Sequence, residues 1–124
     1  YVDHIISVIV GPEVITGSTR MKAGTATKMV LNMITSTLMI KLNKTYGNLM
    51  VDLKASNDKL WDRGTRIIEH LTDLNYDEAL NILKSADGEV KTAVVMEKLK
   101  VGVEAARDRL KNHKGSLKDV FIKE

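Results

Sequence analysis

The residues best suited to chemistry lie in one segment, Gly11–Ala26, which reads GPEVITGSTRMKAGTA. This segment carries the carboxylate of Glu13, the hydroxyls of Ser18 and Thr19, and the cation Lys22. Hydroxyl groups donate hydrogen bonds to phosphate oxygens. The first turn of a helix offers unpaired N–H groups and a dipole that favours negative charge. The segment therefore predicts a loop that meets a small anionic ligand at the start of a helix.

Other side chains of the segment refine this prediction. Thr25 is a further hydroxyl donor, and Gly17 allows the backbone to approach a ligand closely. Arg20 and Lys22 differ by about 200° in helical phase, so they do not share one pocket easily. Glu13 is placed to bind sugar hydroxyls or to move a proton. The alternative is that the hydroxyls cap the helix and the cations are solvated, since the spacing lacks the Gly-Lys-Ser/Thr of a P-loop.

A strand and a long helix are expected to position this segment. Residues 5–10 are β-branched and almost continuously apolar, which is typical of a strand covered on both faces in a parallel sheet. A helix is expected over about residues 18–46, with Gly47 as its terminator. Its apolar side chains surround most of its circumference, which predicts burial against more than one neighbour. Its possible N-caps are Thr16, Ser18 and Thr19.

Two shorter elements follow the long helix. Residues 48–53 are ambiguous between a strand and an extended connector. Ser56 or Asn57 can cap the next helix, whose apolar stripe predicts packing through one face. Gly64 within that stripe predicts close approach of a neighbouring helix, with Trp61 at the edge of the contact. The stripe consists of Leu60, Gly64, Ile67, Ile68 and Leu71.

The last part of the chain contains an internal repeat at an offset of 27 positions. The first copy has Ala79, Leu83, Gly88 and Val94 where the second has Ala106, Leu110, Gly115 and Phe121. Each copy predicts a helix, a glycine stop and the start of another helix. Asn75 and Glu78 resemble a capping box. Residues 75–124 are therefore expected to form a bundle of three or four short helices.

Composition excludes several classes of protein and site. The chain has 124 residues, 44% hydrophobic and 28% charged, as in an ordinary soluble globular protein. It has no cysteine, which excludes disulfides and thiolate metal sites, and its three histidines show no ligand spacing. The net charge of +3 comes from residues 1–57, and no basic stripe with interleaved aromatics indicates nucleic acid. The longest nearly apolar stretch, residues 29–42, is too short and polar to span a membrane, which favours a cytoplasmic protein.

The start of the chain leads to a prediction about its extent. The chain begins at Tyr1 and runs almost at once into the predicted strand. Because a parallel strand needs neighbours, we expect a piece of a longer protein. Residues 1–56 are expected to end an α/β domain, residues 57–74 to form a connecting helix, and residues 75–124 to form a small helical domain. Such a piece should be mostly α, with one or two strands at most.

Three stretches of the sequence resemble one family. Residues 11–26, Val30–Met33 (VLNM) and Tyr46–Asp52 (YGNLMVD) closely resemble the signature of bacterial N-acetylmuramic acid 6-phosphate etherases, and the similarity covers nearly the whole chain. The vertebrate glucokinase regulatory protein is the main related alternative. The resemblance implies the end of an α/β sugar isomerase domain, contributing one strand and a long buried helix. A small helical bundle similar to the ubiquitin-associated type is implied to follow.

The resemblance also implies a reaction. Such enzymes cleave the D-lactyl ether of N-acetylmuramic acid 6-phosphate to N-acetylglucosamine 6-phosphate and D-lactate, by elimination and then addition of water. No cofactor is implied. The family's catalytic carboxylates are expected upstream, so we assign no catalytic residue here and expect this chain alone to be inactive. The residues expected to bind the sugar 6-phosphate are Glu13, Ser18, Thr19 and Lys22.

Two other functions remain open beside the etherase, which we expect to be homodimeric. The chain could be a regulatory module that binds a sugar phosphate without converting it. It could also be a protein-interaction module in which the helical tail binds a partner. Paired carboxylates in upstream sequence would separate the etherase from the regulatory module. Ligand-induced NMR shifts confined to residues 11–26 would argue against the interaction module.

Overall fold

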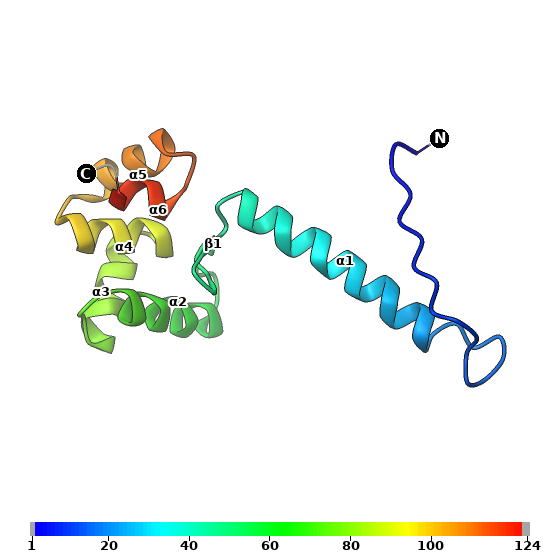
Figure 1. The fold of residues 1–124 in the computed structure, drawn as a ribbon. Coiled ribbons are helices and arrows are strands. Elements are labelled where there is room, and N and C mark those ends of the chain that lie inside the picture. Colours follow the sequence, from blue (N-terminus) through cyan, green and yellow to red (C-terminus); the bar gives the residue numbers. More distant parts are fainter. Residues whose placement is uncertain (1, 123–124) are drawn as a thin grey trace. The chain divides into compact units, whose positions relative to one another are not determined.

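The structure is a computed structural model that describes residues 2–122 (Figure 1). Its contacts divide the chain between Leu38 and Met39 into two units, which we describe separately. The elements are α1 (Lys22–Lys41), β1 (Thr45–Tyr46), β2 (Leu49–Met50), α2 (Asp58–Leu71), α3 (Tyr76–Ser85), α4 (Val90–Leu99), α5 (Val103–Asn112) and α6 (Leu117–Ile122). The prediction of a mostly α fragment is confirmed. The predicted boundaries at residues 56 and 74 stay predictions.

Residues 5–10 do not form a strand in this structure. The large apolar side chains of this segment, Ile5, Ile6, Val8 and Ile9, are exposed. The strand prediction is wrong for the chain as it stands, because the β-branched pattern needs a neighbouring strand to supply backbone hydrogen bonds. The only sheet in the described residues is the antiparallel hairpin of β1 and β2, which resolves the ambiguity of residues 48–53.

The predicted limits of the first helix are also wrong. Helix α1 begins at Lys22, and its first amides are capped by the side chain of Glu13 rather than by Thr16, Ser18 or Thr19. It ends at Lys41 because Asn43 adopts the left-handed conformation, with φ +57°, and the Lys44 N–H donates to the Met39 carbonyl at 2.9 Å. A hydrogen bond of that kind ends a helix without glycine. Gly47 instead turns the hairpin, with φ +57°.

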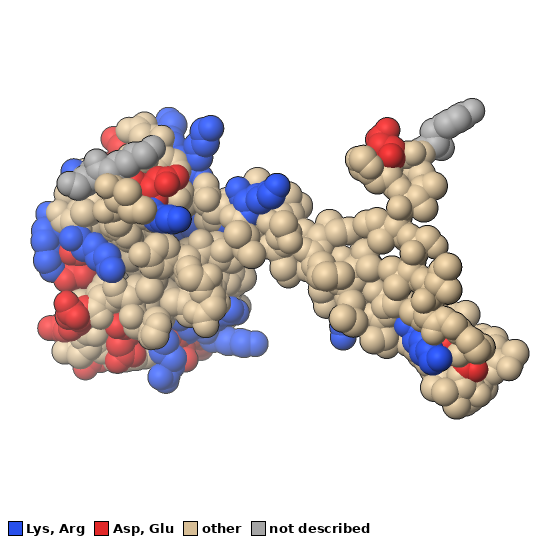
Figure 2. Space-filling view, in the orientation of Figure 1, with Lys and Arg blue, Asp and Glu red and all other residues tan. Residues whose placement is uncertain are grey.

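Helix α1 has no buried residue, which contradicts the prediction of a buried helix. Figure 2 shows few charged atoms along it, in contrast to the mixed Lys, Arg, Asp and Glu atoms over the second unit. Its sequence requires apolar neighbours on several sides, and residues 2–122 do not provide them. The exposed large apolar side chains of α1 are Met29, Leu31, Met33, Ile34, Leu38, Met39 and Ile40.

Helix α2 follows its predicted pattern. Asn57 is its N-cap and accepts a hydrogen bond from the Leu60 N–H at 3.0 Å, which selects it over Ser56. Gly64 lies under α4 and α3: a Cβ there would stand 2.9 Å from Val90 Cγ2 and 3.0 Å from Leu83 Cδ2. The predicted close approach is therefore confirmed, and Trp61 packs partly buried at the edge of the core.

The internal repeat is confirmed in backbone detail. Helices α3 and α5 are offset by the same 27 positions, and in both the C-cap is followed by a left-handed residue and then a left-handed glycine. The Gly88 N–H donates to Leu83 at 2.9 Å, and the Gly115 N–H donates to Leu110 at 2.7 Å. The repeat therefore records one helix–turn–helix unit used twice. The predicted capping box of Asn75 and Glu78 is also formed.

Helix α4 is the centre of the second unit. It contacts α2, α3, α5 and α6, and six consecutive residues from Val90 to Val95 are buried. A helix buried on all sides must be surrounded by short neighbours that each cover one face, as in a small bundle. The bundle therefore consists of α2–α6, with the β1–β2 hairpin packed against it through Tyr46 and Leu49.

Candidate functional site

Glu13 is fixed at the N-terminus of α1. Its carboxylate accepts the Lys22 N–H through Oε2 and the Ala23 N–H through Oε1, both at 3.0 Å. The loop brings a carboxylate nine residues upstream back over the first turn of the helix. A negative charge in this position also interacts favourably with the helix dipole. Glu13 thus performs locally the task that the sequence suggested for a bound anion.

Lys22 closes the same loop from the other side. Its Nζ donates to the Pro12 carbonyl at 2.8 Å, so the backbone N–H of Lys22 binds Glu13 while its side chain binds the preceding residue. Gly11 supplies the left-handed turn that this return requires, with φ +69°. The structure therefore brings Glu13 and Lys22 together, because two hydrogen bonds from Lys22 close the loop between them.

The first four amides of α1 are all paired within the chain. After Lys22 and Ala23, the Gly24 N–H donates to Thr19 at 2.8 Å, and the Thr25 N–H donates to Met21 at 2.9 Å. These are the groups that a helix N-terminus normally offers to an anion. A phosphate at this position would have to displace Glu13. Any phosphate contact therefore involves other groups of the loop.

The pKa of Glu13 is held below its ordinary value. The hydrogen bond from the Ala23 amide is the largest cause and that from the Lys22 amide is the next, since both favour the ionised form. Glu13 is consequently a carboxylate at neutral pH, with lone pairs left for a ligand. It is suited to accept hydrogen bonds from sugar hydroxyls and unsuited to donate a proton.

The other predicted binding residues lie at the tip of the loop. The Ser18 hydroxyl is shielded from solvent and has no hydrogen-bond partner within residues 2–122. Thr19 is exposed, and its N–H donates to the Gly17 carbonyl at 3.1 Å. Arg20 is exposed as well. A shielded hydroxyl without a partner is uncommon, and it is a reason to look for a group that completes it.

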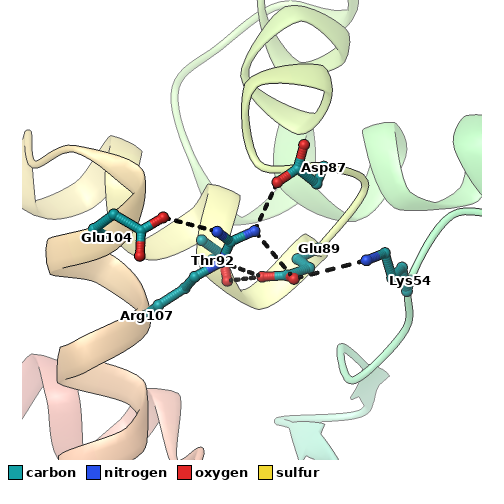
Figure 3. Close-up of polar contacts among 6 residues, drawn as sticks. All are labelled: Lys54, Asp87, Glu89, Thr92, Glu104 and Arg107. Carbon is teal, nitrogen blue, oxygen red and sulfur yellow. Dashed lines mark hydrogen bonds and ion pairs between the residues drawn. The ribbon is translucent and has the colours of Figure 1, made fainter.

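A second polar cluster lies in the bundle, where the sequence analysis found no site (Figure 3). Arg107 of α5 binds Asp87 at 2.7 Å, Glu89 at 3.1 Å and Glu104 at 2.9 Å. Glu89 also accepts the Thr92 hydroxyl at 2.8 Å. The pKa of Glu89 is lowered chiefly by Arg107, and that of Arg107 is raised chiefly by Glu89. The cluster joins α5 to the turn between the two halves of the first repeat, which is a structural task.

Asp52 forms a smaller network beside the hairpin. It binds Lys44 and, at 2.8 Å, Lys91, whose side chain is only 11% exposed. Burial opposes ionisation of Asp52, but the two lysines outweigh it and lower its pKa. Sequence reasoning missed these pairs because their partners come from different elements. The one available signal was the lysine repeated at positions 91 and 118.

Residues 2–122 contain neither a membrane-spanning helix nor a metal-binding cluster of side chains. No helix there combines the length and hydrophobicity needed to cross a lipid bilayer. Likewise, the described part of the chain contains no group of three or more His, Cys, Asp or Glu side chains arranged to hold a metal ion.

Comparison with known proteins identifies relatives over most of the chain. Residues 47–89 match the family described as the C-terminal lid domain of glucokinase regulatory protein. The N-acetylmuramic acid 6-phosphate etherase of Pectobacterium atrosepticum is 52% identical over 94% of this chain. The etherase of Clostridium acetobutylicum is 62% identical over 78% of the chain, and that of Bacillus subtilis is 52% identical over 91%.

These matches cover only part of each relative. The chain spans 39% of the Pectobacterium protein, 32% of the Clostridium protein and 37% of the Bacillus protein. The aligned part is the C-terminal part of those enzymes. Similarity of this extent carries over fold and family, whereas an activity has to be argued from the site.

Proposed function

Because the chain belongs to the family of the N-acetylmuramic acid 6-phosphate etherases, we propose that it forms the carboxy-terminal part of such an enzyme. The observation that carries the proposal is 52% identity over 94% of the chain, including the whole Glu13–Lys22 loop region. The complete enzyme cleaves the D-lactyl ether of N-acetylmuramic acid 6-phosphate. It releases D-lactate and leaves N-acetylglucosamine 6-phosphate.

The proposed reaction is an elimination followed by hydration. A base removes a proton next to the open-chain aldehyde, lactate departs, and water adds to the double bond. General acid–base catalysis requires carboxylates on both sides of the reacting carbons. In our proposal the upstream part of the enzyme supplies those carboxylates. The present chain supplies part of the substrate-binding wall.

The proposed substrate-binding segment is the loop from Glu13 to Lys22, which folds back over the N-terminus of α1. Glu13 accepts hydrogen bonds from sugar hydroxyls, since its carboxylate is ionised and held in place by two amides. In this proposal Ser18 and Thr19 contact the sugar 6-phosphate. The Ser18 hydroxyl, which is shielded from solvent in this structure and has no partner within residues 2–122, would gain one there. Lys22 is the fourth residue of this loop, where its side chain binds the Pro12 carbonyl. The proposal needs no metal or redox cofactor.

The proposal also accounts for the exposed first unit. The apolar side chains of residues 5–10 and of α1 require cover, and the upstream polypeptide of the enzyme would provide it. We also propose that the enzyme is a homodimer located in the cytoplasm.

The test is to express this chain with and without the upstream part of its gene. We expect the longer protein to release D-lactate from N-acetylmuramic acid 6-phosphate in a coupled lactate assay. We expect the 124-residue chain alone to release none. Absence of lactate release by the well-folded longer protein would refute the etherase proposal. Lactate release by the 124-residue chain alone would refute the proposal that the upstream part supplies the catalytic carboxylates.

A second candidate function is a sugar-phosphate-binding regulatory module. The observation that favours it is the match of residues 47–89 to a domain of glucokinase regulatory protein. Such a module would bind the sugar phosphate and leave it unchanged. Calorimetric binding of N-acetylglucosamine 6-phosphate to the longer protein, together with no lactate release, would support this candidate over the enzyme.

A further inference from the structure

We propose that Lys22 is a positioning residue: it holds Glu13 in place through the Pro12 carbonyl and does not itself bind the phosphate. The inference rests on the proposed function for the identity of the ligand. It deepens that proposal, because it assigns two different tasks to the two charged groups of the loop.

The first observation is the geometry of the ammonium group. Lys22 Nζ donates to the Pro12 carbonyl at 2.8 Å, which is a short, charge-assisted hydrogen bond. Pro12 immediately precedes Glu13, so the bond fixes the backbone from which the carboxylate projects. A lysine that binds phosphate acts as a mobile point charge on a flexible stem. Here the stem is folded back on the chain.

The second observation is that Lys22 contacts both sides of the same peptide segment. Its backbone N–H donates to Glu13 Oε2 at 3.0 Å while its side chain holds residue 12. Residues 12, 13 and 22 therefore form a closed ring that contains the first residue of α1. Loss of the side-chain bond leaves Glu13 tied only at its carboxylate, with the preceding backbone free to move.

The third observation concerns where a phosphate could bind. Glu13 and backbone carbonyls occupy all four amides at the start of α1. A phosphate beside Lys22 would lie next to the Glu13 carboxylate and would be repelled by it, since two anions at short range are unfavourable. The Thr19 side chain is exposed, and the Ser18 hydroxyl is shielded but has no hydrogen-bond partner within residues 2–122.

A structural test uses the 124-residue chain. The ¹³C shift of the Pro12 carbonyl reports its hydrogen bond, so Lys22→Met should move it while Lys28→Met should not. Lys28 is the matched control, because it is an exposed lysine of the same helix. An unchanged Pro12 shift in Lys22→Met would overturn the inference whatever the function of the protein.

A functional test uses the longer protein. A positioning role predicts that Lys22→Met raises KM for the sugar phosphate about 10-fold, the usual effect of losing a charge-assisted hydrogen bond. The inhibition constant of inorganic phosphate should stay unchanged. A direct phosphate contact predicts that both constants rise by the same factor, and that outcome would overturn the inference. Lys28→Met should change neither.

Two further measurements test the role of Lys22 independently of the etherase proposal. If the wild-type protein releases no lactate, the etherase proposal fails, and calorimetric binding of N-acetylglucosamine 6-phosphate and of inorganic phosphate replaces the kinetic constants. If Lys22→Met does not fold, Lys22→Arg replaces it, because arginine keeps a charged donor. In Lys22→Arg the Pro12 carbonyl should keep its hydrogen bond, and the inhibition or dissociation constant of inorganic phosphate should stay unchanged. A rise in that constant while the Pro12 hydrogen bond is intact would overturn the inference.

Discussion

At the scale of single residues, Glu13 has a structural task as the cap of α1, and we propose that it also binds the substrate. Two backbone amides hold its carboxylate, and these bonds keep it ionised. The bonds fix its orientation before any ligand arrives, which lowers the entropic cost of binding. If Glu13 binds the substrate as proposed, its carboxylate loses little conformational freedom on binding, because the two amides already hold it.

Protonation of Glu13 should loosen the start of α1. Its folded-state pKa lies below the ordinary value of 4.5, so its contribution is present above that value and is lost as pH falls through the lowered pKa. We expect Glu13→Gln to increase amide hydrogen exchange of Lys22 and Ala23 several-fold at neutral pH, as when a helix loses its cap. Hydrogen exchange followed by NMR measures this.

The control for that experiment is Glu69→Gln, which removes an exposed carboxylate from α2. It should leave exchange at Lys22 and Ala23 unchanged. Equal exchange in wild type and Glu13→Gln would show that the helix start does not depend on the carboxylate.

At the scale of elements, the bundle is organised by a unit used twice. The turns at Gly88 and Gly115 have the same hydrogen bonds, but different elements hold them. Arg107 binds Asp87 and Glu89 at the first turn, whereas Asn43 donates to the Lys114 carbonyl at the second. The local geometry follows the repeat, and the contacts that stabilise it differ because the two copies have different neighbours.

Gly64 should not tolerate a larger side chain. Even a Cβ would stand within 3.0 Å of Val90 Cγ2 and Leu83 Cδ2, so Gly64→Val has to displace both. We expect the free energy of unfolding to fall by about 2 kcal/mol, the usual cost of overpacking a core. Urea unfolding of the chain measures it. Glu69→Val places the same side chain on the exposed side of α2 and should cost less; equal losses would contradict the proposed helix contact.

Arg107 should stabilise the bundle more than a single surface ion pair does. It joins three carboxylates on two elements, and networks with fixed geometry exceed isolated pairs. We expect Arg107→Ala to lower Tm more than Arg66→Ala. Among the described residues Arg66 pairs with a single carboxylate, Asp62 on its own helix, beside a cation–π contact with the Tyr76 ring. Thermal unfolding by circular dichroism measures both.

The pH dependence of Arg107→Ala provides a second check. The pKa of Glu89 is below 4.5 in the folded state chiefly because of Arg107. The stabilisation is therefore present above that value and disappears as pH falls through the lowered pKa. The difference in Tm between wild type and Arg107→Ala should shrink in acid. A difference that is constant from neutral pH to pH 3 would argue against this network.

At the scale of the whole molecule, the two units differ in how well they bury their apolar side chains. Within the described residues, Met50 and Ile122 are the only exposed large hydrophobic side chains outside residues 2–42. The bundle has a contiguous core around α4. A protein that exposes a large apolar surface is expected to associate through it. The apolar side chains of the first unit therefore require cover from polypeptide outside residues 2–122, whereas the second unit buries its own apolar side chains.

Truncation should separate these behaviours. Residues 39–124 should form a folded monomer, because their core is complete within the unit. The full 124-residue chain should self-associate through residues 2–42. Light scattering after size-exclusion chromatography distinguishes the two. A monomeric full chain at high concentration, or an unfolded truncated chain, would contradict this division.

Several structural features could be read from the sequence because neighbouring residues determine them. The caps at Asn57 and Asn75 depend on a side chain and an amide three residues apart. The turns at Gly88 and Gly115 follow from the left-handed conformation that glycine allows. Gly64 predicted a close helix contact because glycine has no side chain to hold a neighbouring helix away. The Gly11–Ala26 signature likewise indicates the family from sequence alone.

Tertiary structure alone decided the rest. The cap of α1 comes from a carboxylate nine residues away, the Lys22 side chain is held by a carbonyl, and Arg107 binds residues 18 and 20 positions away. No sequence period relates such partners, because the path of the loop brings them together. The strand at residues 5–10 failed for the opposite reason: its pattern is local, but a strand forms only where another chain segment supplies the hydrogen bonds.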